Sequence, residues 1–344
     1  MKLSDFSYNL PQHLIAQEPL LRRDASRLLV LHRENGQLED RSFNEITRFI
    51  SKKDLLVLND TKVFNARLIG KREGFEGKIE LLISHKVDNG LYACLGKPAR
   101  KLKEGTRLSF GNNRLSAEVV STDCDFKIIR FITDDLDDIL DNIGEVPLPP
   151  YIKRSPKEID KDRYQTVYAK TKGAIAAPTA GLHFSDELLS DIESKGIEAL
   201  AITLHVGYGT FKPVTDDNID NHNMHKEFYH ISKDAADKIN KTKQSGGRVF
   251  AVGTTVCRGL ESAAIKEKES YFVHPKESET DLFISPGYGF KITDALITNF
   301  HLPYTTLLML VAAFSGKFDI LKVYEHAIKK GYRFYSYGDA MLIL

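Results

Sequence analysis

The chain has 344 residues, enough for two domains, and its 42% hydrophobic and 28% charged residues are typical of a globular protein. A formal net charge of +1 excludes a uniformly basic molecule, so nucleic-acid binding would require a local basic patch. The N-terminus MKLSDFSYNL lacks the apolar segment of a secretion signal, and the longest apolar run, residues 307–314, is too short to span a bilayer. We therefore expect a cytoplasmic protein without a membrane segment, and three scattered cysteines with no CxxC pair agree with this.

The first third of the chain predicts a change from mixed structure to a small β-domain. Mixed structure ends in the strand-like run DLLVLND at residues 54–60. Six short strand-like segments follow, separated by Gly, Asn and Asp turns, which is typical of a small antiparallel barrel or sandwich. They are VFNARLIGKR, KIELLISHKV, GLYACLG, RLSFG, RLSAEVVST and FKIIRFIT. An acidic run and the proline cluster EVPLPPY at residues 145–151 close this zone.

From residue 152 onward, strands and helices alternate. Ser185 is a helix N-cap with Gly196 as the stop, and residues 232–247 form a second capped helix. ALAITLHV predicts a strand buried on both faces, RVFAVG a strand leading into the helix VCRGLESAAIK, and DALITNFH a strand before the helices TTLLMLVAAF and 320–328. We predict an α/β fold: a mixed sheet covered by helices, with an inserted small antiparallel β-barrel. The α/β domain would comprise residues 1–62 and 152–344, and the barrel residues 63–151.

Polar groups and tight turns follow three of the predicted strands. His205 ends one strand, the turn Gly253-Thr254-Thr255 ends the next, and Asn299 and His301 end the third. Each feature alone is common in structural turns and caps. Because functional residues of open α/β sheets gather at the carboxyl ends of strands, together they indicate one crevice. The N–H groups of the turn at Thr254, with Arg258 nearby, could hold an anion.

The segment HNMHKEFYH, residues 222–230, allows two interpretations. His222, His225 and Glu227 could hold a metal ion in a hydrolase. If the segment is extended, however, His225 and Glu227 share one face while His230 points away, which favours an acid–base pair. We therefore predict no metal site.

Two basic segments are a solvated surface or a nucleic-acid contact. KPARKLKEGTR lies in the predicted barrel, and YIKRSPKEIDKDRYQ interleaves tyrosines with basic residues. The second interpretation predicts phosphate contacts together with a base stacked on tyrosine, as in an RNA-binding module. Its residues would be Lys97, Arg100, Lys101, Lys103, Arg107, Lys153, Arg154, Tyr164, Gln165 and Tyr168.

The uncharged segment GAIAAPTAGLHF, residues 173–184, is either a loop that lets a ligand approach the backbone or a buried connector with a satisfied histidine. In the first interpretation Ala180 and Gly181 leave room for the ligand, Pro178 fixes the path of the chain, and His183 supplies a polar group at the entrance to a helix.

Long motifs resemble the S-adenosylmethionine:tRNA ribosyltransferase-isomerases of queuosine biosynthesis. They include RDASRLLVL, LVLNDTKVFNARL, GEVPLPPYIKR, GAIAAPTAGLHF, HVGYGTFKPV, HNMHKE, TNFHLP and YRFYSYGDAMLI. The resemblance runs from about residue 14 to the C-terminus. In that family the serine after GTT and the serine before TLLML are usual, whereas this chain has Val256 and Thr305.

The resemblance implies that the ribosyl group of S-adenosylmethionine is transferred and isomerised onto an aminomethyl-deazaguanine at the tRNA wobble position. S-adenosylmethionine is then a co-substrate, no further cofactor is expected, and the partners are tRNA and this donor, bound by a monomer. Implied acid–base residues are Glu227, His225, His183 and His301. Implied donor-binding residues are Thr179, Gly181, His205, Gly253, Thr254, Thr255, Arg258, Asn299 and Asp60.

Overall fold

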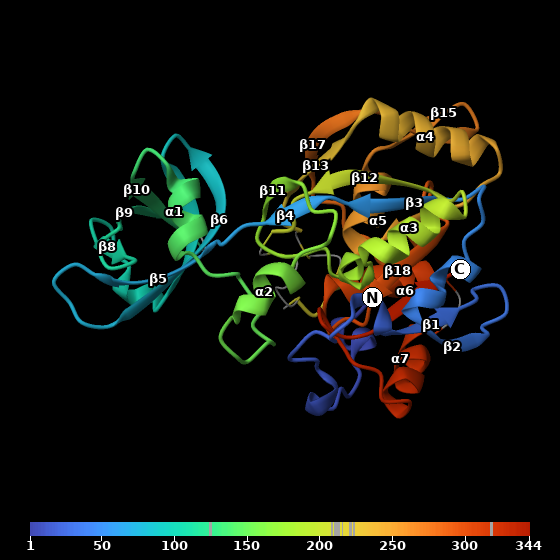
Figure 1. Cartoon of the computed structure of the whole chain (residues 1–344), viewed down its shortest axis with the longest axis horizontal. Coiled ribbons are helices and arrows are strands. Elements are labelled where there is room, and N and C mark those ends of the chain that lie inside the picture. Colours follow the sequence, from blue (N-terminus) through green and yellow to red (C-terminus); the bar gives the residue numbers. More distant parts are fainter. Residues whose placement is uncertain are drawn as a thin grey trace.

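A nine-stranded mixed sheet forms the body of the protein (Figure 1). The computed structural model describes residues 1–123, 126–207, 209, 214, 216–219, 222, 224–316 and 319–344. Across the sheet the order is β17-β13-β12-β3-β14-β18-β19-β1-β2. The strands are β1 (Arg27–Leu31), β2 (Leu38–Ser42), β3 (Leu55–Asn59), β12 (Glu198–Leu204), β13 (Glu227–Ile231), β14 (Val249–Val252), β17 (Lys276–Thr280), β18 (Ala295–Asn299) and β19 (Ala340–Ile343).

Four central strands, β12, β3, β14 and β18, run parallel to one another, so their carboxyl ends share one edge. β19 runs antiparallel to β18 and brings its amino end, beside Asn299, to that same edge. The sequences of these strands are almost entirely apolar because both faces of the sheet are covered by other residues. In β3, Leu55 and Val57 face one core, and Leu56 and Leu58 face the other. The mixed sheet is therefore confirmed.

Seven α-helices are described, most of them against the two faces of this sheet. They are α1 (Leu136–Ile143), α2 (Glu158–Arg163), α3 (Asp186–Ser194), α4 (Lys233–Gln244), α5 (Thr254–Ser262), α6 (Thr306–Ser315) and α7 (Ile320–Lys329). The expected caps are present, since the hydroxyls of Ser185 and Ser232 accept hydrogen bonds from the first turns of α3 and α4. Thr305 caps α6 in the same way, which explains why threonine can replace a serine there. No helix in the described part of the chain has the length and apolar character of a bilayer span.

Two local expectations were wrong. The amino half of β12 is largely exposed, because β13 pairs only with Thr203 and Leu204 and leaves the rest of that edge open. The helix α5 ends at Ser262 rather than near residue 266, because Ala264–Glu267 forms β15 and pairs with β16 (Ser270–Val273) instead.

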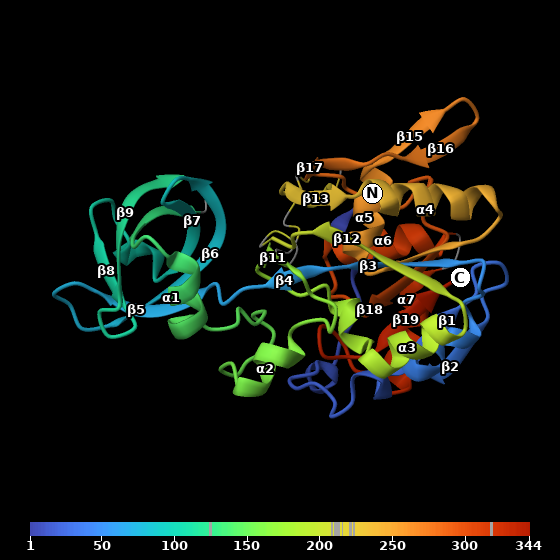
Figure 2. The ribbon, with the colours of Figure 1, turned by 45° about the horizontal axis from the view of Figure 1, so that its top comes forward.

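The six strand-like segments form a closed antiparallel barrel, as expected, which stands to one side of the sheet (Figure 2). Its strands are β5 (Arg67–Arg72), β6 (Lys78–Asp88), β7 (Leu91–Lys97), β8 (Arg107–Phe110), β9 (Leu115–Asp123) and β10 (Phe126–Ile132). Alternate residues fill the interior, and Leu140 of α1 packs against it. The domain boundaries at residues 63 and 151 stay a prediction.

Contacts from the body hold the barrel in place. A short parallel ladder joins β4 (Thr61–Val63) to β11 (Thr171–Ala174). Just after it, Ile175 is buried in the barrel core, and the ammonium of Lys172 lies 2.9 Å from an Asp137 carboxylate oxygen on α1. The segment GAIAAPTAGLHF thus begins as a connection between the two parts.

Gly181, in the 3₁₀ turn η6 (Thr179–His183), is packed closely against other residues of the protein. A Cβ atom there would lie 2.1 Å from the Tyr168 hydroxyl and 2.8 Å from Cγ2 of Thr166. Both neighbours would have to shift for any side chain to fit.

We therefore expect Gly181→Ala to lower the free energy of unfolding by about 1–3 kcal/mol through overpacking. Gly289→Ala is the matched control, because nothing lies within 4 Å of its added Cβ, and its effect should stay within about 0.5 kcal/mol. Urea denaturation of both variants measures the difference, and equal stabilities would contradict the packing argument.

Candidate active site

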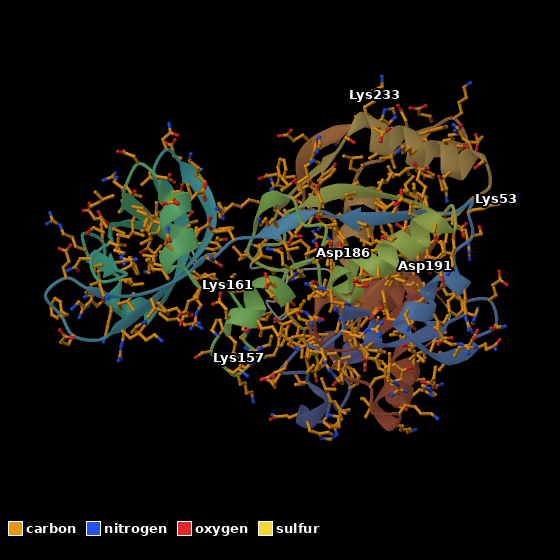
Figure 3. The ribbon with its side chains drawn as sticks, in the orientation of Figure 1. Lys53, Lys157, Lys161, Asp186, Asp191 and Lys233 are labelled. Carbon is orange, nitrogen blue, oxygen red and sulfur yellow. The ribbon has the colours of Figure 1, made fainter. Side chains whose placement is uncertain are left out.

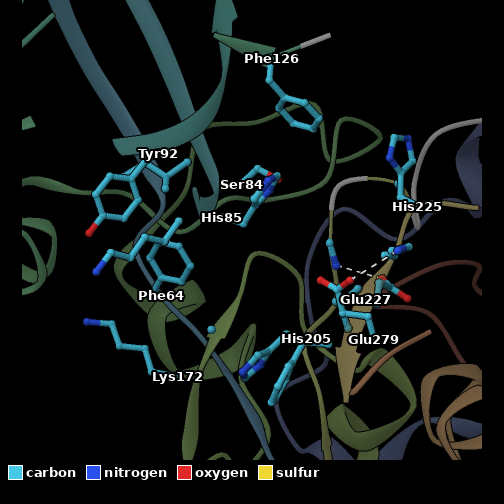
Figure 4. A pocket seen from close by; sticks show the side chains of 18 of the residues that line it. Phe64, Ser84, His85, Tyr92, Phe126, Lys172, His205, His225, Glu227 and Glu279 are labelled. Atoms are coloured by element: carbon cyan, nitrogen blue, oxygen red, sulfur yellow. Dashed lines mark hydrogen bonds and ion pairs between the residues drawn. The ribbon is translucent and has the colours of Figure 1, made fainter. Parts of the chain in front are cut away.

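A cavity of about 770 Å³ lies between the barrel and the carboxyl ends of the sheet strands (Figure 4). The barrel side supplies His85, Tyr92 and Phe126. The body supplies polar and aromatic groups from the ends of β12, β13 and β17 and from β11. These are Lys172, His205, His225, Glu227, Phe228 and Glu279. Size and lining are those of a small-molecule site.

Glu227 forms a buried ion pair at the base of this cavity. Its carboxylate accepts a hydrogen bond from Nη1 of Arg258 on α5, and the side chains are only 3% and 4% exposed, respectively. The other carboxylate oxygen accepts from the backbone N–H of Gly207 at 3.0 Å. Within the described residues, no acceptor reaches the buried Nη2 of Arg258, although Arg258 itself does not line the cavity. The two residues predicted separately as base and anion ligand therefore form one unit.

His225 and His205 lie on either side of Glu227 in the cavity wall (Figure 4). His225 is exposed to the cavity, whereas His230 lies outside it, as the extended interpretation predicts. Nδ1 of His205 is 2.8 Å from the Thr61 hydroxyl, and its ring stacks on Phe228 at a centroid distance of 5.4 Å. Burial lowers the pKa of His205, against a smaller opposite effect of Asp60. Neutral imidazole thus predominates there near pH 7.

The glycine–threonine turn borders a smaller hollow. Gly253, at a φ of 99°, precedes α5, and its N–H already donates to the Ile297 carbonyl. Thr254 and Thr255 in the first turn of α5 line the hollow with Thr179 and His301. Its volume of about 30 Å³ suits a water or one polar group rather than a whole substrate. Val206 lines both this hollow and the large cavity, so the two are adjacent.

His183 is held by the protein on both ring nitrogens. The Ser26 hydroxyl lies 2.7 Å from Nδ1, and the Asn299 amide nitrogen lies 3.1 Å from Nε2. Asn299 also donates to the Tyr335 carbonyl, while no donor in the described chain reaches its Oδ1. The segment before His183 is thus a buried connector across the strand ends in this structure. The contact of this segment with a bound ligand remains a prediction.

Burial lowers the pKa of both His183 and His301 to about 3. For His183 the charges of Arg333 and Arg23 add to the effect. Nε2 of His301 is 2.7 Å from the Thr298 hydroxyl. Both imidazoles are neutral at physiological pH, so neither acts there as an imidazolium acid.

This predicts how stability depends on pH. In the unfolded chain these histidines titrate near pH 6.5, so between about pH 3 and 6.5 the unfolded state binds more protons. The contribution of these two histidines to the free energy of unfolding is complete above about pH 6.5. On acidification it falls by about 1.4 kcal/mol per pH unit for each histidine. Urea denaturation measures the free energy of unfolding at each pH. Between about pH 6 and 5 this free energy should fall less steeply on acidification for His301→Gln than for the wild type. An unchanged slope would contradict burial of a neutral His301, and His230→Gln serves as the control.

Asp60 directly follows β3 and lines neither the large cavity nor the small hollow beside it. Its carboxylate accepts a 2.6 Å hydrogen bond from the Thr203 hydroxyl and a 3.4 Å bond from Thr171. It therefore ties β3, β12 and β11 together.

The predicted tRNA-binding residues divide into exposed and structural groups. Lys97, Arg100, Lys103, Arg107 and Lys153 are exposed and Lys101 is partly buried. Figure 3 shows Lys157, which directly precedes α2, and Lys161 on α2 at the surface.

The others have structural partners. Arg154 pairs with both oxygens of buried Asp160, at 2.6 and 2.8 Å. Gln165 bonds both backbone groups of Val63. Tyr164 is 1% exposed, with its ring edge-on to Tyr337, so it presents no face to a base in this structure. Tyr168 packs beside Gly181.

The sequence analysis missed several residues that line the cavity or support it. Thr61 directly follows Asp60, and Lys172 directly precedes Gly173, so adjacency to singled-out segments was the available signal. His85 and Glu279 gave none, because single polar residues alternate along many exposed strands. No group of three or more His, Cys, Asp or Glu side chains in the described part of the chain is placed to hold a metal ion. Part of the motif HVGYGTFKPV lies outside the described residues, as does Asn223 of HNMHKE.

The comparisons with known proteins cover the same whole chain. A family model described as "Queuosine biosynthesis protein" matches residues 3–343. The chain belongs to this family. The resemblance found in the sequence is thereby confirmed.

Individual members of the queuosine biosynthesis family match this chain over its full length. A protein of Caldanaerobacter subterraneus named S-adenosylmethionine:tRNA ribosyltransferase-isomerase is 51% identical over 346 residues, covering 100% of both chains. One with the same name from Acetivibrio thermocellus is 51% identical over 345 residues, again covering 100% of both. The crystal structure of an S-adenosylmethionine tRNA ribosyltransferase from Thermotoga maritima is 38% identical, with a TM-score of 0.55, and the match covers 99% of this chain and 100% of that one.

Proposed function

We propose that this chain transfers and isomerises the ribosyl moiety of S-adenosylmethionine onto 7-aminomethyl-7-deazaguanine at the tRNA wobble position. The products are epoxyqueuosine-tRNA, adenine and methionine. Full-length identity of 51% to proteins named for this activity carries the proposal. The cavity between barrel and sheet has the size and polar lining that a nucleoside donor and a modified base require.

Within this proposal the donor lies along the strand ends and the modified base enters from the barrel side. Nη2 of Arg258, buried and without an acceptor in the described chain, suits the methionine carboxylate. The aromatic rings of Tyr92 and Phe126 line the barrel wall and suit stacking on a base. Thr254, Thr255 and Asn299 remain candidates for polar contacts with the donor.

His225 is our choice for the general base. The sulfonium acidifies the donor's 5′-methylene, and a nearby base removes its proton. Both oxygens of Glu227 already accept hydrogen bonds from Arg258 and Gly207, whereas His225 faces the open cavity. Glu227 then positions Arg258. The carbanion left at the 5′ carbon bonds to C1′ as the C1′–O4′ bond breaks, and the aminomethyl nitrogen replaces adenine at C1′ with loss of a proton. The freed O4′ oxygen then closes the epoxide by displacing methionine from the 5′ carbon.

Mass spectrometry of tRNA carrying the aminomethyl-deazaguanine, after incubation with protein and S-adenosylmethionine in EDTA, tests the function. The expected product carries an added epoxycyclopentane unit, with adenine released. Unmodified tRNA that still binds the folded protein would reduce it to a binding module. Activity restored only by added metal would revive the hydrolase-type site at His222, His225 and Glu227.

The same assay tests the base. We expect His225→Gln to lower kcat by about 10²- to 10⁴-fold, the usual contribution of a general base, without a matching rise in KM. His230→Gln is the matched control, since this exposed histidine of β13 lies outside the cavity. A kcat within a few-fold of wild type for His225→Gln would assign the base elsewhere.

We further propose that S-adenosylmethionine serves as co-substrate without an added cofactor, and that the protein acts as a cytoplasmic monomer.

A further inference from the structure

A third hollow, of about 20 Å³, lies where three distant segments of the chain meet. The turn η3 (Arg23–Ala25), the end of α2 and residues 336–338 form its walls. Arg22, Arg23 and Arg163 line it, and no carboxylate does. Its other polar side chains include the hydroxyls of Ser26 and Ser336, so donors dominate the surface.

Two arginines of this hollow, Arg23 and Arg163, are held by neutral acceptors, whereas Arg22 donates to both carboxylate oxygens of Asp24, at 3.3 and 3.1 Å. Arg23 donates to the carbonyls of Leu182 and Asp162, at 3.3 and 2.6 Å. Arg163 donates from Nη1 to the Leu21 carbonyl at 2.9 Å, and its buried Nε has no acceptor in the described chain.

Neither guanidinium has a carboxylate within ion-pair distance among the described residues, unlike Arg154 and Arg248. The carboxylate of buried Asp160 is already used by Arg154, Tyr337 and the Lys157 N–H.

These two charges are therefore poorly compensated. Burial lowers the pKa of Arg23, and the charge of Arg163 lowers it further, with Asp186 and Asp162 opposing from a distance. Burial likewise lowers the pKa of Arg163. Arg333 lies nearby and is also held by carbonyls, of Glu18 and Tyr337. A cluster of guanidiniums without counter-charge is stabilised when an anion binds to it.

We propose that Arg23 and Arg163 form a phosphate site that holds a backbone phosphate of the RNA substrate. The inference rests on the proposed function for the identity of that RNA. A polyanion fits better than the donor's carboxylate, because the exposed lysines of residues 153–161 border the same region. The hollow also shares no lining residue with the large cavity. Arg163 was part of a basic run in the sequence, but its pairing with Arg23 arises only in the fold.

The test measures binding of an unmodified tRNA transcript by fluorescence anisotropy at several KCl concentrations. We expect Arg163→Gln to weaken binding about tenfold at low salt. It should also reduce the slope of log affinity against log salt by about one, as for one lost phosphate contact. Arg48→Gln is the matched control, because this exposed arginine does not line the hollow and, among the described residues, its guanidinium pairs with Glu45. Its affinity and slope should stay near wild type.

Other outcomes separate the alternatives. An unchanged slope in Arg163→Gln would overturn the proposal, as would a loss of S-adenosylmethionine affinity with unchanged tRNA binding, which would place the donor's carboxylate in the hollow. If Arg163→Gln does not fold, Arg163→Lys decides: it keeps the charge but not the fork of donors. Weaker binding at an unchanged slope then supports the site, and unchanged binding overturns it.

Binding requires no turnover, so this result is independent of the activity assay. A wild-type protein that binds tRNA with this salt dependence but forms no product would refute the proposed function and leave the phosphate site standing.

Discussion

The parallel alignment of β12, β3, β14 and β18 is the constraint on which the rest of the structure depends. Parallel strands must all end at the same edge of the sheet. Residues separated by more than two hundred positions therefore meet there, from Asn59 to His301. The two-faced apolar cores hold that alignment, and the polar side chains that follow the strands are left at the rim. The large cavity and the small hollow beside it, which share Val206, both lie at this edge.

The barrel turns this edge into an enclosed site. It is attached through Ile175, which is buried in the barrel core, and through the ion pair of Lys172 with Asp137. The segment GAIAAPTAGLHF starts within β11, which pairs with β4. This one segment therefore connects the barrel with the sheet and runs on across the ends of the strands. Small residues are required along it, since Gly181 leaves no room for a Cβ beside Tyr168.

Charge is distributed unevenly around the strand ends. At one end, Glu227 and Arg258 compensate each other in a buried pair, and Nη2 of Arg258 has no acceptor in the described chain. In the middle, His183 and His301 are neutral because burial disfavours their charged forms. At the other end, Arg23 and Arg163 have no compensating carboxylate in the described chain. The arrangement suits a zwitterionic donor at one end and a polyanion at the other.

The sequence alone determined what depends on near neighbours: the apolar strands, the caps at Ser185 and Ser232, the six barrel strands and the long family motifs. These follow from local periodicity and hydrogen bonding within a few residues. It also predicted that polar groups would gather at the strand ends. Only the tertiary structure decided that Glu227 pairs with Arg258, that Tyr164 is buried, and that Arg23 meets Arg163. Such contacts join segments far apart in the chain, and packing, rather than local pattern, brings their side chains together.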